Sequence, residues 1–451
     1  MVDTAAEDRD GAALREAAFR PIQMPGRWFW PIFVGLSAVV LAALAAYVYQ
    51  VRSGLWVAGY TDSAFYGIYE ANLVAFIGVS YGGALVSAVL RLTNARWRLP
   101  ITRMAEGMAL VSLLIGASFA IVHLGRPERI WELIVEPQAG SPIVWDAIAI
   151  TTYLVATLIF LYLPLIPDLA IARDRLGPSA GRLRRTLYRW AAVGWIGAPA
   201  QRRSLNWSVS AMAILIIPLA VVVHSVLAWA FSMTSRPGWH STIFGPYFVI
   251  GALYSGVALV IVVVAAFRKA YALERYIGLQ HFVSLARIMA VLGVIYLYLT
   301  FAEMLTSAYT RTREEASIVA VLLEGAYAPA FWLFMIGGIL APILIGFLPG
   351  ARKVRYLVLA GLLAVVGMWL KRLLITLPAS TAPLIGDVWG TVQVTWVAIV
   401  ITLGAMAAIP LGLMILFRFV PVLALDEMAE AGRESYSEPV VGQVQTGEAV
   451  P

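Results

Sequence analysis

Three ionisable residues and one amide mark the ends of apolar stretches in this sequence. Glu70 and Asn72 stand where one stretch begins, His123 stands where the next one ends, and Asp146 opens the one after it. Ionisable groups are expensive to place in lipid, so such positions point to a function. An imidazole accepts a proton near neutral pH, and a nearby carboxylate can take that proton onward. The group therefore suits proton transfer.

Aromatic side chains accompany these groups: Trp145 precedes Asp146, and Trp239 precedes His240 in a short Pro-Gly connection. Imidazole, carboxylates, an amide and aromatic rings together suit a ring with two protonatable oxygens that enters from lipid. Oxidation of such a quinol releases two protons and two electrons, so its hydroxyl groups need hydrogen-bonded acceptors. The outer vestibule of a transporter would contain the same residue types, and composition leaves both interpretations open. Further candidates for a proton path are Asp62, His224, Glu303 and Asp387.

The elements that must position these residues are membrane-spanning helices. Of 451 residues, 61% are hydrophobic and 13% are charged, which excludes a soluble enzyme, a disordered chain and a coiled coil. Apolar windows long enough to cross a bilayer predict about ten helices in an all-α polytopic membrane protein. The predicted spans are 29–50, 68–92, 102–123, 143–168, 207–232, 245–267, 282–306, 327–348, 354–377 and 391–416.

The distribution of charge predicts the orientation of these helices. Most of the 33 lysines and arginines lie in segments on the same side as the N-terminus, so the positive-inside rule places both termini in the cytoplasm. We expect a cytoplasmic segment at 1–28, a transmembrane domain at 29–425 with a basic cytoplasmic loop at 169–206, and a disordered cytoplasmic tail at 426–451. The loop is expected to act as a cytoplasmic retention signal that also touches anionic lipid headgroups, and a dedicated partner site is the alternative.

Cofactor and partner types follow from what the sequence contains. It has no cysteine, which excludes thiolate zinc sites, cysteine-ligated iron–sulfur clusters and covalently attached haem. Its four histidines are not spaced as paired haem ligands, so we predict that this chain holds no haem, no iron–sulfur cluster and no metal. The basic residues lie between apolar segments rather than in one patch, which favours the lipid bilayer as a partner and argues against nucleic acid.

Several strings resemble the NrfD/PsrC family of membrane subunits from polysulfide-reductase-type complexes. His123-Leu124-Gly125-Arg126-Pro127 and Ser141-Pro142-Ile143-Val144-Trp145-Asp146 carry that resemblance. A closer similarity, to the quinol-binding membrane subunit of alternative complex III, rests on further strings. These are Ile166-Pro167-Asp168-Leu169-Ala170 with Arg173-Asp174-Arg175, the segment from Pro237-Gly238-Trp239-His240 to Phe248, and Phe419-Val420-Pro421 before Glu427.

The resemblance implies two four-helix bundles plus two peripheral helices, in a bacterial cytoplasmic membrane. It implies a quinol pocket near the outer face, with menaquinone or ubiquinone as substrate and protons released on that face. His123 and Asp146 become the catalytic candidates, and the quinone-binding candidates are Glu70, Asn72, Arg126, Trp145 and His240. The implied partners are an iron–sulfur subunit of the molybdopterin oxidoreductase type at the outer face, a homologous membrane subunit and haem-bearing cytochrome subunits.

Three other functions stay open. The chain could anchor a molybdopterin oxidoreductase and reduce quinone, because the direction of the reaction depends on the potentials of its partners. A secondary transporter would use broken helices around a midplane site, and Gly82-Gly83 and Gly337-Gly338 are faint signs of one. A purely structural anchor would leave the buried charges without a purpose.

Overall fold

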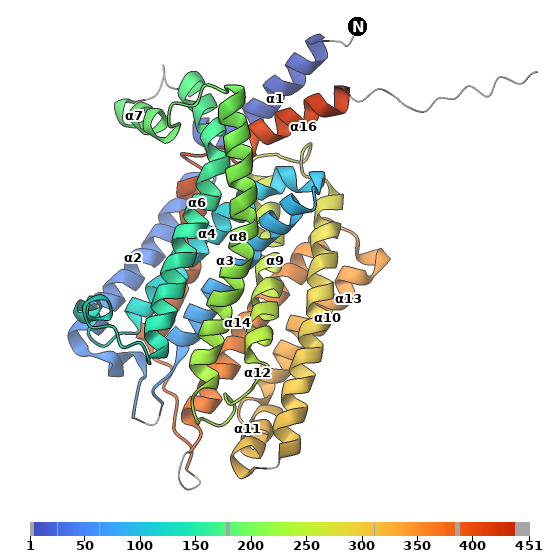
Figure 1. Ribbon diagram of the computed structural model, residues 1–451. Coiled ribbons are helices and arrows are strands. Elements are labelled where there is room, and N and C mark those ends of the chain that lie inside the picture. Colours follow the sequence, from blue (N-terminus) through green and yellow to red (C-terminus); the bar gives the residue numbers. More distant parts are fainter. Residues whose placement is uncertain are drawn as a thin grey trace, which may run out of the picture.

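The computed structural model describes residues 4–24, 26–62, 64–176, 181–310, 312–383 and 388–437 (Figure 1). Within these ranges the chain is almost entirely helical, and ten helices are long and apolar enough to cross a membrane. The all-α polytopic fold is therefore confirmed. The ten spans are α2 (Phe29–Ser53), α3 (Ile68–Leu92), η2 with α4 (Arg96–Arg98, Leu99–Val122), α6 (Pro142–Leu176), α8 (Pro199–Ser232), α9 (Phe244–Ala270), α10 (Leu279–Thr310), α12 to α13 (Ala328–Phe347), α14 (Val354–Thr381) and α15 (Trp396–Leu416).

Helix ends follow local capping chemistry. α3 begins beside Gly67, whose backbone N–H donates to the Glu70 carboxylate at 2.6 Å. α15 begins at Trp396, five residues later than predicted, because Thr395 caps it by accepting a hydrogen bond from the backbone N–H of Ala398 at 3.3 Å. The span formed by α12, η4 (Leu333–Leu340) and α13 contains a π-helical stretch at η4.

The spans pack as two bundles with a peripheral pair. One bundle contains α3, α4, α6 and α8, and the other contains α9, α10, the α12–α13 span and α14. α2 and α15 pack against each other beside the first bundle, mainly along α4. This is the predicted arrangement of two four-helix bundles and two peripheral helices.

Glycines join the two bundles. A Cβ atom added to Gly82 on α3 would lie 2.3 Å from the Cα atom of Gly256 on α9. The two helix backbones therefore touch directly, as small residues allow in membrane proteins. Gly82 is explained by this close packing, and the structure offers no broken helix at this position.

The segments predicted as a loop and a tail contain helices. α6 continues to Leu176, α7 spans Arg182–Ala191 and α8 begins at Pro199, so most of the basic loop 169–206 is helical. Helix α16 (Leu425–Ser437) forms the first part of the segment 426–451 that we expected to be disordered, and residues 438–451 lie outside the described residues. α1 (Thr4–Gln23), α7 and α16 gather at one end of the molecule (Figure 1), which we call the terminal end.

Acidic residues of α16 explain why it folds. Glu427 forms ion pairs with Arg91 and Arg98, the second at 3.0 Å, and Asp426 pairs with Arg202 at 3.1 Å. Beneath them the Arg103 guanidinium, 1% exposed, binds Asp168 at 2.8 Å and Glu106 at 3.2 Å. This charge cluster holds the C-terminal helix against the ends of α3, α4, α6 and α8. The sequence alone does not predict this charge cluster, because the residues that pair in it come from separate helices.

The remaining short elements lie at the ends of the spans. They are η1 (Leu55–Ala58), η3 (Pro127–Arg129), α5 (Glu132–Val135), α11 (Arg313–Leu323) and η5 (Pro349–Ala351). α11 lies at the end opposite α1 and α16 (Figure 1). We call that opposite end the site end, because the predicted site residues gather there.

Candidate functional site

The structure joins Glu70 and His123 at the site end of the first bundle. Nδ1 of His123, the residue that follows α4, contacts Oε1 of Glu70 in the first turn of α3. The second oxygen, Oε2, accepts hydrogen bonds from the Tyr60 hydroxyl at 2.9 Å and from the backbone N–H of Gly67 at 2.6 Å. The Glu70 side chain is 8% exposed and that of His123 is 32% exposed, so the imidazole is the more open side of the pair.

Two tyrosines enclose the imidazole. The ring centroid of Tyr66 lies 5.8 Å from that of His123 in a stacked arrangement, and that of Tyr60 lies 5.7 Å away in a tilted one. Tyr66 in turn contacts Trp239 at 5.5 Å. The sequence reading missed both tyrosines, since they stand in an irregular segment where no periodicity marks them. A signal was available in the run of aromatic residues just before Glu70.

The charges of this site alter proton affinities around it. Burial lowers the pKa of His123, but the hydrogen bond and negative charge of Glu70 outweigh that effect and raise it above 6.5. Burial, and then the charge of Glu70, raise the pKa of Tyr60 well above 10. Burial also raises the pKa of Tyr66, with added contributions from Glu70 and Asp146. The tyrosines therefore stay neutral while His123 has an increased affinity for a proton.

Asp146 lies close enough to Tyr66 for its charge to act on that hydroxyl group. It stands in the first turns of α6, and its Oδ1 atom is buried without a hydrogen-bond partner among the described residues. A buried carboxylate oxygen that lacks a donor is costly, so a partner from outside the chain would relieve it. Asp146 thus has the features expected of a group that contacts a substrate hydroxyl.

Asn72 lies on α3 close to Glu70 but takes part in different contacts. Its Nδ2 donates to the Thr402 hydroxyl at 2.8 Å, and its Oδ1 accepts from the indole N–H of Trp369 at 2.8 Å. Residues two apart on a helix point to nearly opposite sides. Asn72 therefore links α3 to α14 and α15, and the structure does not bring it to the Glu70–His123 pair.

Other predicted site residues lie at the protein surface. Arg126 is exposed and forms no ion pair with a described residue, because the chain turns into η3 directly after it. The Trp145 side chain is 52% exposed, and its indole N–H donates to the Ala139 carbonyl at 2.8 Å. His240 and Asp62 are exposed. Asp387 lies outside the described residues.

A turn explains the position of His240. Gly238 has a φ of +78°, and the turn places the neighbouring Trp239 in the interior, where its indole N–H donates to the Ile375 carbonyl at 2.7 Å. His240 consequently faces outward. In the Gly238-Trp239-His240 string it is therefore the tryptophan that holds this connection against α14, while the histidine lies at the surface.

His224 belongs to a second polar group deeper in the first bundle. It is fully buried on α8, and its ring centroid lies 4.9 Å from that of Tyr81 on α3. Both imidazole nitrogens lack a hydrogen-bond partner among the described residues. Nearby polar atoms in the same condition belong to Ser80, Tyr81, Tyr153 and Thr157. Buried polar atoms normally have hydrogen-bond partners, and internal water molecules often provide them. This group of polar side chains is therefore suited to bind internal water.

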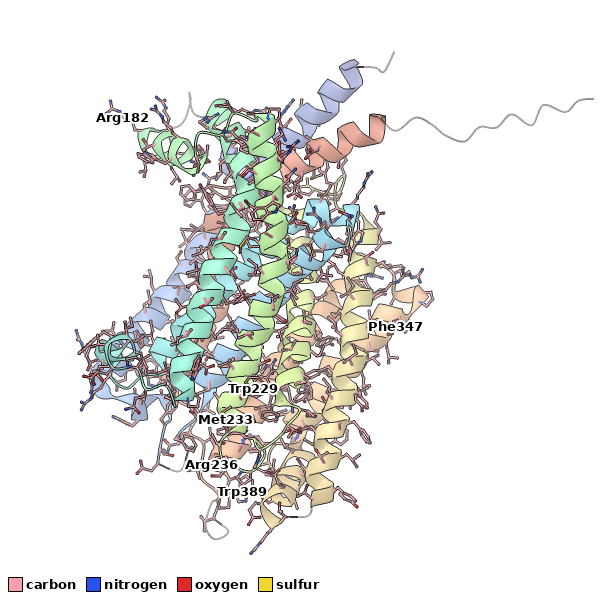
Figure 2. The ribbon with its side chains drawn as sticks, viewed as in Figure 1. Arg182, Trp229, Met233, Arg236, Phe347 and Trp389 are labelled. Atoms are coloured by element: carbon pink, nitrogen blue, oxygen red, sulfur yellow. The ribbon has the colours of Figure 1, made fainter. Side chains whose placement is uncertain are left out.

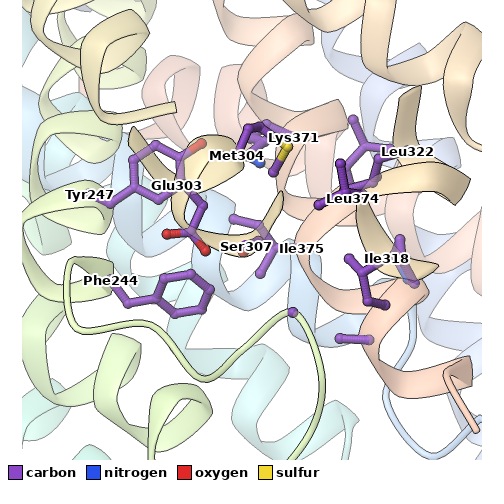
Figure 3. Close-up of a pocket in the computed structure, with 14 residues that line it drawn as sticks. Phe244, Tyr247, Glu303, Met304, Ser307, Ile318, Leu322, Lys371, Leu374 and Ile375 are labelled. Atoms are coloured by element: carbon purple, nitrogen blue, oxygen red, sulfur yellow. The ribbon is translucent and has the colours of Figure 1, made fainter. Parts of the chain in front are cut away.

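Glu303 lies in the second bundle, apart from the Glu70–His123 pair. Its Oε2 accepts a hydrogen bond from the Ser241 hydroxyl at 2.6 Å, and its side chain lines a small cavity with Lys371 and Tyr247 (Figure 3). The volume of that cavity is about 20 Å³, which is room for about one water. An aromatic ring does not fit in that volume. The cavity lies between α9, α10, α11 and α14, with mostly apolar side chains around Glu303 and Lys371.

Metal-binding residues do not gather in the part of the chain that the structure describes: it contains no group of three or more histidine, cysteine, aspartate or glutamate residues able to hold an ion. The Glu70–His123 pair can itself bind and release protons. An imidazole held by a carboxylate at Nδ1 leaves Nε2 to accept a proton, and Asp146 offers a second acceptor.

Comparison with known proteins identifies relatives of this chain. It is 27% identical over 411 residues to a dimethyl sulfoxide reductase membrane subunit of Halobacterium salinarum, covering 86% of this chain and 90% of the relative. It is 25% identical over 360 residues to a selenate reductase subunit of Mesobacillus selenatarsenatis, covering 78% and 82%. It is also 23% identical over 369 residues to the Hdr-like menaquinol oxidoreductase integral membrane subunit of Archaeoglobus fulgidus, covering 81% and 83%.

A family model described as "Polysulphide reductase, NrfD" matches residues 56–383. The matched region begins in η1, before Glu70, and ends just after α14, so it contains both bundles and leaves out α2 and α15. It includes His123 and Asp146. Because this match covers well over half of the sequence, the chain belongs to the polysulphide reductase NrfD family.

Proposed function

We propose that this protein is the quinol-oxidising membrane subunit of a multisubunit electron-transfer complex. The observation that carries the proposal is the contact between His123 and Glu70 at the site end. It is supported by Asp146, whose charge acts on Tyr66, the ring stacked on His123, and whose buried Oδ1 atom lacks a donor among the described residues. In this proposal Glu70, His123 and Asp146 line one site around the rings of Tyr60 and Tyr66, which lie next to the imidazole. A lipid-soluble ring with two hydroxyl groups matches this set.

The residues have separate tasks in this proposal. Glu70 orients the imidazole through Nδ1, so Nε2 of His123 accepts the proton of one hydroxyl group. Asp146 accepts a hydrogen bond from the other hydroxyl group and then its proton. Oxidation removes two protons and two electrons from quinol, and the protons leave through the site end. The electrons pass to an iron–sulfur partner subunit.

The names of the relatives support a redox complex and bear on its type. One relative is named as a menaquinol oxidoreductase subunit, which supports menaquinol as the substrate. Two others are named as subunits of dimethyl sulfoxide and selenate reductases. These names favour an anchor for a molybdopterin-type reductase as much as a subunit of the alternative complex III type. In both cases an iron–sulfur partner would dock at the site end, which the charge distribution predicts to face outward from a cytoplasmic membrane.

Mutants of the intact complex test the proposal. His123→Gln and Asp146→Asn should each lower quinol-dependent reduction of the partner centres by about 100-fold, the usual contribution of a positioned proton acceptor. Copurification of the partners should be unchanged. Glu136→Gln, an exposed carboxylate on the same loop as η3 and α5, provides the control. Wild-type turnover in both site mutants would overturn the proposal, and so would the absence of any quinone from lipid extracts of the active complex.

A further inference from the structure

Helix α7 is an amphipathic helix outside both bundles, at the terminal end (Figure 1). Its ten residues include four arginines, and its residues form three stripes at helical spacing. Arg184, Tyr188 and Ala191 form the stripe that faces the rest of the chain. Leu183, Leu187 and Trp190 form an apolar stripe next to it. The third stripe carries arginines, among them Arg182 and Arg189.

Hydrogen bonds hold α7 in a defined orientation. The Tyr188 hydroxyl donates to the Phe419 carbonyl at 3.0 Å, and the Arg184 guanidinium donates to the Arg418 carbonyl at 2.9 Å. The Tyr162 hydroxyl of α6 donates to the Ala191 carbonyl at 2.8 Å. These bonds join α7 to α6 and to the segment after α15. The apolar and basic stripes therefore point in directions set by the folded protein.

The apolar stripe is exposed although its residues are large. Leu183 is 85% exposed, Trp190 is 80% exposed and, just beyond the helix, Ile196 is 80% exposed. Trp207 in the first turns of α8 is 74% exposed and continues the same kind of surface onto a membrane-spanning helix. The outward residues farther along α8, such as Ile214, are apolar and exposed and must face lipid. The stripe therefore continues a lipid-facing surface toward the membrane interface.

The charged residues around this stripe are positive. Arg182, labelled in Figure 2, projects away from the bundles, and Arg182, Arg189 and Arg203 form no ion pair with a described residue. Arg202 differs, because it is neutralised by Asp426 and lies over the Trp195 ring. The sequence has no aspartate or glutamate between Asp174 and Glu274. An open groove at the start of α8 is lined by Pro199, Ala200, Arg203, Ser204 and Trp207.

We propose that α7 and the first turns of α8 form a docking surface for anionic phospholipids. The surface consists of Leu183, Leu187, Trp190, Ile196 and Trp207 with Arg182, Arg189 and Arg203, and we call it the α7 surface. Its apolar stripe enters the acyl chains while its arginines contact the phosphate groups, as in helices that lie in the membrane interface. Tryptophan prefers this same level of the bilayer. An acidic protein would match the arginines but not the continuity of the apolar stripe with the lipid-facing side of α8.

Lipid bound to the α7 surface would affect the stability of the protein rather than quinol oxidation. Because Tyr188 and Arg184 tie α7 to the segment before α16, a lipid bound there would also stabilise the C-terminal segment. The inference does not depend on the proposed function, since the surface lies at the end opposite the Glu70–His123 pair.

Lipid retention by the purified complex tests this inference. The complex is placed in nanodiscs of phosphatidylcholine with or without phosphatidylglycerol, and retained lipids are counted by native mass spectrometry. The double variant Arg182→Gln/Arg189→Gln should lose preference for phosphatidylglycerol by about 25-fold, given about fivefold for each arginine near an anionic surface. The control, Arg352→Gln/Lys353→Gln, removes two exposed charges from the connection before α14 and should keep the wild-type preference.

Hydrogen–deuterium exchange over 182–196 provides a second readout. We expect these amides to be protected more strongly in discs with phosphatidylglycerol, and Leu183→Ser/Trp190→Ser to weaken protection in both kinds of disc. Unchanged exchange in α3 shows that a variant is folded. Equal lipid preference in the two charge variants would overturn the inference. Protection of α7 that follows the presence of partner proteins and ignores lipid composition would also overturn it, in favour of a protein partner.

Discussion

Nδ1 of His123 contacts Oε1 of Glu70, and the other oxygen of that carboxylate accepts hydrogen bonds from Tyr60 and from the backbone of Gly67. The first contact crosses from α3 to the end of α4, while the other two are local. Glu70 therefore has a double role: it caps α3 and it orients the imidazole. A residue fixed by its own helix end is a rigid support for a proton acceptor.

Glu70→Gln should separate these two roles. A glutamine carbonyl still accepts the hydrogen bonds from Tyr60 and Gly67, so α3 keeps its first turn and the complex still assembles. The negative charge that favours a protonated imidazole is lost, and quinol oxidation should fall by about 100-fold. Steady-state turnover of the purified complex measures this, with Glu136→Gln as the matched control. Full activity in Glu70→Gln would show that His123 works without a carboxylate.

The raised pKa of His123 predicts a stability that depends on pH. Glu70 stabilises the protonated imidazole, so its contribution to folding is complete below pH 6.5 and is lost as pH rises through the higher pKa of the folded state. Thermal unfolding of the detergent-solubilised protein from about pH 5 to about pH 9 would follow this change. In His123→Gln that part of the pH dependence should disappear. Parallel curves for the two proteins would contradict the assignment.

Asp146→Asn should abolish activity without lowering stability. The buried Oδ1 atom has no donor among the described residues, so a neutral amide at this position costs less to bury than a carboxylate. We expect the thermal unfolding temperature to stay the same or rise while quinol oxidation is lost. The combined result is diagnostic, because a purely structural carboxylate would lower both quantities when replaced.

Gly82→Ala tests the contact between the two bundles. The new Cβ would lie 2.3 Å from Gly256 Cα. Because the Cβ is fixed to the backbone of α3 and the Cα belongs to the backbone of α9, neither can turn aside and the two helices must move apart. Overpacking of this kind costs about 1 to 3 kcal/mol of stability. Gly35→Ala on α2 is the control, because a Cβ there meets nothing within 4 Å. Thermal unfolding of the two variants should therefore differ, and equal stability would argue against direct backbone contact.

Glu427→Gln should loosen the C-terminal helix. Burial raises the pKa of Glu427, but Arg91, Arg98 and Arg103 outweigh it and hold that pKa below 4.5. The carboxylate thus contributes stability above pH 4.5, and the contribution is lost as pH falls through the lower pKa of the folded state. Removing the charge leaves arginines uncompensated and should cost about 2 kcal/mol. Faster proteolysis of α16 at neutral pH would report the loss, and Glu430→Gln is the control.

The sequence alone determined the number and approximate limits of the membrane spans. An apolar stretch of about 20 residues is a local property. For nine of the ten predicted spans, the helix in the structure begins and ends close to the predicted limits or continues beyond them. α15 is the exception at its start, where Thr395 provides a cap that hydropathy does not register. The sequence also placed Glu70, His123 and Asp146 at helix ends, because position along a helix sets depth in a membrane.

Tertiary structure decided which of these polar groups meet. Glu70 and Asn72 lie at a similar depth, and the sequence therefore predicts them in one site. They point to different sides of α3, however, so Glu70 contacts His123 whereas Asn72 contacts Thr402 and Trp369. Glu303 stands near the end of α10, at the site end like Glu70, but it lies in the other bundle, where it contacts Ser241. Hydropathy reports how deep a residue lies, whereas its partners depend on the rotation and neighbours of its helix. Those are set by packing between segments hundreds of residues apart, such as the contact of Asn72 with Thr402.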